Sequence, residues 1–170
     1  MNKSANNDIN TIHNNGNANN NLLHSTQNNF FAESQGENTL QSIRLRLKSF
    51  LDGNIDIANR LKKHMGMPLV ERFDIYKAES LEDEVLRAFP SLYSTFHCLR
   101  LSLEKANRII EAATEIANRP PDPHLPNNGK AHAIHYQFNQ LRLHIDTNIV
   151  PICVKILEDE NVINEDNLQG

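Results

Sequence analysis

The sequence lacks tryptophan and has only two cysteines, Cys98 and Cys153. Neither thiol has a second cysteine at the spacing of a zinc site or a redox motif, and both fall within helix-periodic apolar stretches. We therefore expect two buried, reduced thiols, and we predict neither a metal nor another cofactor.

Long apolar runs and clustered glycines are also missing. The longest apolar run, residues 149–154, includes Pro151 and is far shorter than the roughly 20 residues that cross a bilayer. One lysine followed by polar, asparagine-rich sequence is not the pattern of a secretory signal. We expect a cytoplasmic protein without a membrane span, with the nucleus or export by a non-classical route as open alternatives. The few glycines are not clustered, which excludes a glycine-rich phosphate loop.

Asparagine, in contrast, is abundant: there are 24, and 13 of them precede Thr39. Residues 1–37 hold one lysine, three acidic residues and ten apolar residues. Such a segment buries too little apolar surface to offset the entropy of ordering its backbone, about 1 to 2 kcal/mol per residue. We predict a disordered arm over residues 1–37, a folded domain over 38–157 and an acidic, frayed tail over 158–170.

Two apolar pairs interrupt the polar arm, Leu22-Leu23 and Phe30-Phe31. They are candidates for docking onto a partner or back onto the domain. Because isolated apolar pairs in tails often have no role, a simple spacer is the alternative.

The folded domain begins with a long helix predicted from about residue 39 to Gly66. Its apolar residues recur at steps of three and four, as on one face of a helix. This face consists of Leu40, Ile43, Leu47, Phe50, Asn54, Ile57 and Leu61. Asn54 is its polar interruption, and Gly53 is a weak point that we expect the helix to cross.

Residues 69–89 are less regular, and we predict two short helices there. The first uses Leu69, Val70, Phe73 and Tyr76. The second begins at Ser80, where three acidic residues follow, and ends before Pro90.

The strongest periodic signal covers residues 91–117, where every step between apolar positions is three or four residues. These positions are Leu92, Phe96, Leu99, Leu103, Ala106, Ile110, Ala113 and Ala117. The alanines allow another helix backbone to approach closely. Consecutive prolines, Pro120 and Pro121, must end this helix.

A last helix is predicted over residues 130–157, with a kink at Pro151 because the apolar pattern drifts between Asn148 and Ile149. Three long helices and one broken or short helix bury their apolar faces most simply as an antiparallel bundle, so the predicted class is all-α. Asn148, like Asn54, lies on a seam, and a seam asparagine fixes register when it meets another polar group. We hypothesise that the two amides meet or that each faces a partner; exposure at the rim is the alternative.

Charge is unevenly distributed along the chain. Residues 38–65 carry six basic and two acidic groups, residues 69–89 carry three and six, and residues 155–170 carry one and five. This distribution favours contacts of a basic first helix with acidic segments of the same protein over a phosphate-binding face, so nucleic acid is not an expected partner.

Eight histidines raise the question of a metal site. His132 and His135 can share a helix face, and His124 and His144 are further candidates. Zinc needs a third or fourth ligand, and the sequence has no HExxH or paired-cysteine motif. We therefore expect ordinary surface histidines.

The segment His97-Cys98-Leu99-Arg100-Leu101-Ser102 resembles the phospho-accepting helix of histidine-phosphotransfer domains, which are four-helix bundles. The resemblance covers only these six residues, and it implies that an exposed His97 accepts a phosphoryl group. Those domains keep a small residue where this chain has Leu101, because a response regulator must approach the imidazole closely. This departure weighs against phosphotransfer.

No nucleophile, base and orienting acid occur together at catalytic spacing, so we predict no enzymatic activity. Our hypothesis is a protein-interaction module, a small helical adaptor, regulator or assembly subunit that binds another protein or itself. Its packing or interface residues are predicted on the helix seams: Asn54, Leu103, Ala106, Ile110, Ala113, Ala117 and Asn148. The alternatives are a phosphotransfer protein that uses His97 and a microbial effector that binds a host protein.

Overall fold

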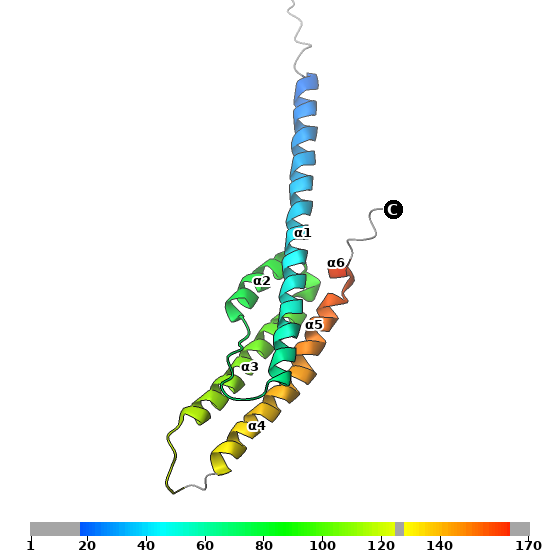
Figure 1. Ribbon diagram of the computed structural model, residues 1–170. Coiled ribbons are helices and arrows are strands. Elements are labelled where there is room, and N and C mark those ends of the chain that lie inside the picture. The colour runs from blue at the N-terminus through cyan, green and yellow to red at the C-terminus, as the bar shows by residue number, and fades with distance from the viewer. Residues whose placement is uncertain (1–17, 125–127, 164–170) are drawn as a thin grey trace, which may run out of the picture. The chain divides into compact units, whose positions relative to one another are not determined.

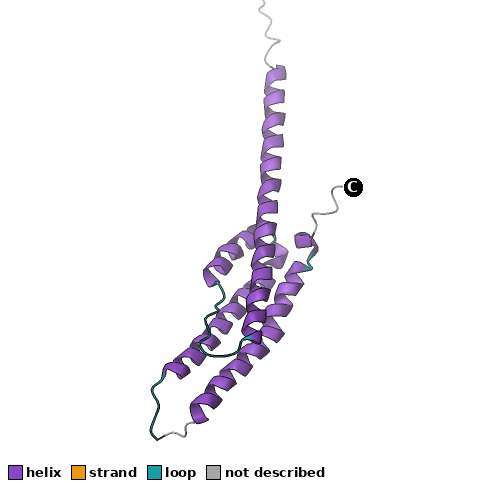
Figure 2. Ribbon diagram, viewed as in Figure 1, coloured by secondary structure: helices purple, strands orange, loops and turns teal. Residues whose placement is uncertain are grey.

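The computed structural model describes residues 18–124 and 128–163, except for the side chains of 18–35, 37, 38 and 128 (Figure 1). Every regular element in this part of the chain is helical, and it contains no strand (Figure 2). The predicted all-α class is confirmed. The chain divides into two units, Met1–Thr39 and Leu40–Gly170, and each is described by itself.

The second unit is a helical bundle centred on α3. The elements of the chain are α1 (Ala18–Lys63), α2 (Ile75–Ala88), a 3-10 turn η1 (Pro90–Leu92), α3 (Tyr93–Asn118), α4 (Asn128–His144), a π-helical turn η2 (Ile145–Ile149), α5 (Val150–Leu157) and α6 (Glu160–Ile163). The elements α2, α4, η2 and α5 all contact α3. The helices α3 and α4 lie side by side and run antiparallel (Figure 1).

The first helix starts earlier than predicted. Its backbone is helical from Ala18, so the expected start near residue 39 is wrong. Residues 18–35 contain neither glycine nor proline, and extending an existing helix avoids the cost of nucleating a new one. Residues 1–17 of the predicted disordered arm, and the side chains of its two apolar pairs, lie outside the described part of the chain.

Within the second unit, α1 buries one stripe of side chains. The buried residues are Ile43, Leu47, Phe50, Leu51, Asn54, Ala58 and Leu61. Two predicted members of this face, Leu40 and Ile57, are only partly buried, because the stripe passes through Ala58 instead of Ile57. The rings of Phe50 and Phe96 pack 5.9 Å apart and join α1 to α3. The helix crosses Gly53 without a break, as predicted.

The two short helices predicted after α1 are one helix in the structure. Residues 64–74 are not helical, and Leu69 and Phe73 are buried there as separate anchors while Val70 is 85% exposed. The carboxylate of Asp74 accepts a hydrogen bond from the Lys77 N–H at 2.9 Å and caps α2. The predictions of a helix over 69–76 and of a start at Ser80 are therefore wrong, since this cap sets the helix start at Ile75.

The long signal over residues 91–117 is confirmed by α3. Its buried side chains are Phe96, Leu99, Leu103, Ala106, Ile110 and Ala113, and Leu92 is buried in the preceding η1 turn. The helix ends at Asn118, just before the paired prolines, as the sequence predicts.

The irregularity of the last long helix lies one turn before the predicted kink at Pro151. Leu141, Ile145, Ile149 and Cys153 are all fully buried, at steps of four residues. In an α-helix of 3.6 residues per turn, each such step rotates the stripe by about 40°, so three steps would carry it out of the core. The η2 turn corrects this drift, because the Val150 N–H donates to the Ile145 carbonyl in an i to i+5 bond.

The first residues of the predicted acidic tail, 158–163, are ordered in the structure. Residues Glu160–Ile163 form α6, Val162 is fully buried, and the Arg44 Nε–H donates to the Asn161 carbonyl at 2.8 Å. The predicted fraying is thus wrong for residues 158–163, because one apolar side chain and one backbone contact hold this segment. Residues 164–170 lie outside the described part of the chain.

Candidate functional site

The predicted seam residues of α3 lie inside the bundle. Leu103, Ala106, Ile110 and Ala113 are fully buried, and Ala117 is partly buried near the helix end. Their solvent-inaccessible positions make them packing residues of this unit. A surface that is free to bind a partner must be sought elsewhere.

The two seam asparagines hydrogen-bond within their own helices. The buried Asn54 amide donates to the Phe50 carbonyl at 2.8 Å. The partly buried Asn148 amide contacts His144 Nδ1 at 3.1 Å and Thr147 Oγ1 at 2.8 Å. No hydrogen bond joins Asn54 to Asn148 among the described residues, so the hypothesis that they pair has no hydrogen bond to support it.

His144 is buried where η2 meets α3, contrary to the expectation of a surface histidine. Its Nε2–H donates to the Ser102 carbonyl at 2.8 Å, which leaves Nδ1 to accept from the Asn148 amide. The contact with Asn148 requires a neutral ring, because a protonated Nδ1 cannot accept. Burial lowers the pKa of His144 from 6.5, the hydrogen bond to Ser102 partly opposes this shift, and the charge of Lys105 adds to it.

A charged network links α2 to α3 around His97. Glu82 accepts from His97 Nδ1 and, at 2.5 Å, from Arg100 Nε, while Arg100 also contacts Glu104. Burial disfavours the charge of Arg100, but the hydrogen bond to Glu82 and the charges of Glu82, Glu104 and Glu79 outweigh it and raise the pKa of Arg100. The Tyr93 ring stacks on His97 with centroids 5.9 Å apart.

The two thiols have different environments. Cys153 is fully buried, and burial raises its pKa to about 12. Cys98 is exposed, so the prediction that both cysteines are buried is wrong for this residue. The helix-periodic pattern of α3 places Cys98 one position past His97, outside the buried stripe.

Metal-binding and membrane-spanning features are absent from the described residues. No group of three or more histidine, cysteine or acidic side chains there is arranged to hold a metal ion. His132 and His135 are both exposed on α4. None of the described helices combines the length and apolar character needed to cross a bilayer.

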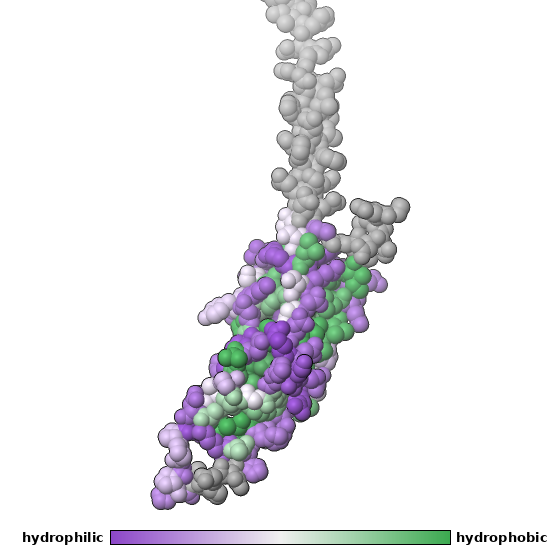
Figure 3. Space-filling model, in the orientation of Figure 1, coloured by the Kyte–Doolittle hydropathy of each residue, from purple (hydrophilic) through white to green (hydrophobic). Residues whose placement is uncertain are grey.

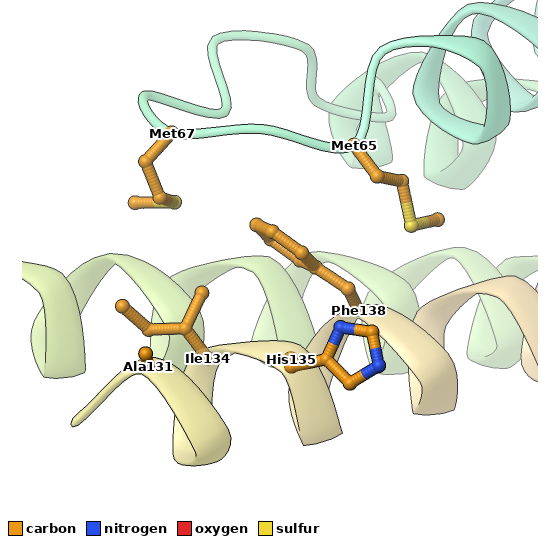
Figure 4. A pocket seen from close by; sticks show the side chains of 6 residues that line it. All are labelled: Met65, Met67, Ala131, Ile134, His135 and Phe138. Carbon is orange, nitrogen blue, oxygen red and sulfur yellow. The ribbon is translucent and has the colours of Figure 1, made fainter. Parts of the chain in front are cut away.

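An apolar groove lies between α4 and the segment that follows α1. Its volume is about 360 Å³, and it is lined by Met65, Met67, Ala131, Ile134, His135 and Phe138. Figure 4 shows the two methionines on the segment and Ile134 and Phe138 pointing toward them from α4. We call this feature the methionine groove. No residue of α4 before Leu141 is fully buried, so this end of the helix is only partly covered.

Polar contacts hold the segment that carries the two methionines. The side-chain amide of Asn107 on α3 donates to the Phe73 carbonyl at 2.9 Å and accepts from the Phe73 N–H at 3.0 Å. Arg60 at the end of α1 donates to Glu71 at 2.8 Å, and this hydrogen bond lowers the pKa of Glu71. The groove wall is therefore fixed at both Glu71 and Phe73.

Sequence reasoning missed both the groove and its support. Met65 and Met67 flank the predicted helix end at Gly66 and belong to no recognised motif. Asn107 lies next to the α3 seam residue Ala106 and also belongs to no motif. One signal was available: two of the three methionines in the chain lie within three residues of each other. Methionine is adaptable in shape and is common at surfaces that bind varied apolar partners.

We predict that replacing Asn107 with alanine destabilises the protein by about 1 to 3 kcal/mol, because it leaves the Phe73 N–H and carbonyl without their partners. Denaturant unfolding followed by circular dichroism measures this loss. Asn107→Asp retains the acceptor but not the donor and should also be destabilised. Wild-type stability in Asn107→Ala would show that water can replace the two hydrogen bonds between the Asn107 amide and Phe73.

We predict that His144 makes the protein less stable as the pH falls below about 6.5. The unfolded chain binds a proton in this range, whereas the folded ring, with its lowered pKa, binds it only at more acidic pH. His144→Gln removes this contribution, so its unfolding free energy should fall less than that of wild type between about pH 7.5 and about pH 5.5. The exposed His132→Gln serves as control, and parallel profiles for wild type and His144→Gln would contradict the prediction.

These features offer a groove for apolar side chains, an ion network and a neutral buried histidine. Comparison with known proteins finds no family model, no curated protein and no solved structure that this chain matches. Function must therefore be argued from these residues.

Proposed function

We propose that this protein is an interaction module, a small helical adaptor, regulator or assembly subunit whose partner is another protein. The observation that carries this proposal is the methionine groove, an open apolar site beside a core whose α3 stripe is fully buried. Apolar cavities of a few hundred Å³ are typical of binding sites. Filling the groove would bury Ile134 and Phe138 further without disturbing the core.

A second apolar surface supports the same proposal. All residues of α5 except Lys155 are apolar, yet Val154 is exposed and Val150, Ile152 and Leu157 are only partly buried. Figure 3 shows hydrophobic residues gathered over α5. A helix that is apolar on all sides is usually covered, so this surface adds area that a partner can use.

The proposed compartment is the cytoplasm. Cys98 is an exposed free thiol, and a reducing compartment keeps such a group from forming disulfides between molecules. A microbial effector delivered into the cytoplasm of a host cell meets the same reducing conditions, so the exposed thiol of Cys98 is equally compatible with that alternative.

The proposal predicts that a charge in the groove abolishes partner binding. Met67→Glu places a carboxylate among apolar side chains and should reduce capture of the partner by about tenfold or more, because an unpaired charge is costly to desolvate. The measurement is affinity capture from the native cell with quantification of proteins that co-purify.

Val70→Glu is the matched control, since it makes the same change three residues away on a side chain that is 85% exposed. It should capture the partner as well as wild type does. Equal melting temperatures of the two variants exclude unfolding as the cause. Equal capture by wild type and Met67→Glu would contradict the groove as the binding site.

Phosphotransfer by His97 is a second candidate, favoured by one observation. Glu82 binds Nδ1 of the ring, and no hydrogen bond to Nε2 occurs in the described part of the chain, so Nε2 is the available nucleophile. Leu101, 45% exposed one turn away, and the carboxylates of Glu82 and Glu104 oppose the approach of a phosphorylated partner. Acid-labile phosphate on wild type but not on His97→Gln after incubation with acetyl phosphate would support this candidate, and an unlabelled wild type would remove it.

A further inference from the structure

We infer that the methionine groove takes an acidic apolar segment of a partner protein, one that carries apolar side chains flanked by carboxylates. This inference rests on the proposed interaction function and adds the chemistry of the partner. The inference follows from the charges beside the groove, which are mainly positive although the net charge of the chain is negative.

The parts of both segments nearest the lining residues lack acidic side chains, because Glu71 and Asp74 of the segment after α1 lie beyond residue 70 and Glu71 is paired with Arg60. Residues 57–70 contain Arg60, Lys62 and Lys63 and no aspartate or glutamate. The helix α4 contains Lys130 and Arg142 and again no acidic residue. The whole chain has a formal net charge of −4, so the excess of basic residues beside the groove is a local feature.

Three of these cations lack a carboxylate partner within the described residues. Arg60 is bound to Glu71 and Lys62 to Asp146. In contrast, Lys63 and Arg142 form no ion pair there, and the Lys130 ammonium donates only to the Arg119 carbonyl, at 2.8 Å. Carboxylates of a bound segment can therefore pair with Lys63, Lys130 and Arg142 without displacing an existing ion pair.

The cations also have a defined spacing relative to the apolar side chains. Lys130, Ile134, Phe138 and Arg142 follow one another at steps of four, and each neighbouring pair is offset by only about 40° around the helix. Lys130 therefore flanks Ile134, and Arg142 flanks Phe138 one turn further along the helix. The run spans about 18 Å, with the two apolar residues about 6 Å apart at its centre. A helical segment of the pattern Glu-x-x-x-Leu-x-x-x-Leu-x-x-x-Glu reproduces this spacing with opposite charge.

The acidic tail of the same molecule is a poor occupant. It is held at α6, where Val162 is buried and Arg44 binds the Asn161 carbonyl. Leu157 already lies about 28 Å along the helix axis from Phe138, and the tail starts beyond it. The inferred occupant is a segment of a partner protein, and the apolar floor favours protein over nucleic acid.

The methionines provide a direct test. The chain has three, Met1, Met65 and Met67, so methyl NMR of the full chain with labelled methionine gives two reporters in the groove and the Met1 signal for comparison. The probe is a synthetic helical peptide of the pattern above. We expect it to shift the Met65 and Met67 signals but not that of Met1, with an affinity that falls as salt is raised.

Charge reversal separates electrostatic recognition from simple apolar contact. The same peptide with lysine in place of glutamate should bind about tenfold more weakly to wild type, and Lys130→Glu should invert this preference. Lys77→Glu, on α2 and away from the groove, is the matched control and should behave as wild type.

Several results would overturn the inference. These are the absence of shifts with the acidic peptide, equal binding of both peptides to wild type, shifts produced by polyuridine alone, and shifts that appear when the protein alone is concentrated. The last would identify a second copy as the occupant. If the peptide result is negative but Met67→Glu still abolishes partner capture, the interaction function stands and only the acidic chemistry of the partner is wrong.

Discussion

The burial of α3 is the constraint on which the second unit depends. Its stripe of six core side chains is fully closed to solvent, and α2, α4, η2 and α5 each contact it. Burying one large apolar side chain contributes about 1.5 to 3 kcal/mol, whereas an exposed ion pair contributes about 0 to 1 kcal/mol. The apolar stripe therefore supplies most of the cohesion. The contact of Glu82 with Arg100 helps to position α2 along it, and the contact of His144 with Ser102 helps to position the end of α4.

How far the fold was predictable follows from how regular each apolar pattern is. In α3, where the steps of three and four continue without interruption, the helix and its buried face were predicted correctly. Three successive steps of four in the last helix hid the π turn, since spacing alone does not reveal an i to i+5 bond. In residues 64–74, Leu69 and Phe73 have the four-residue spacing of a helix face, but they are buried from a non-helical segment. The capping residue Asp74 was the better indicator of where α2 begins.

The groove could not be predicted because it results from a difference in helix lengths. The helix α1 ends at Lys63, while α3 continues to Asn118 and α4 begins only after the following loop. The distal parts of α3 and α4 thus pack against each other with no third helix shown to cover them. Ile134 and Phe138 have the spacing of core residues, and only the three-dimensional structure reveals that they are partly exposed.

The way in which the groove wall is held explains how a bundle can keep apolar side chains available for binding. Asn107 and Arg60 fix the wall through hydrogen bonds and an ion pair at Phe73 and Glu71, several residues away from the methionines. The wall therefore does not need to collapse onto Phe138 to be stable. In the proposed interaction, a partner segment would meet a backbone that folding has already ordered, and preorganisation of this kind increases the affinity that a small apolar contact can achieve. In the proposed interaction, stability and binding depend on different residues: the buried stripe of α3 supports the fold, and the methionine groove would receive the partner.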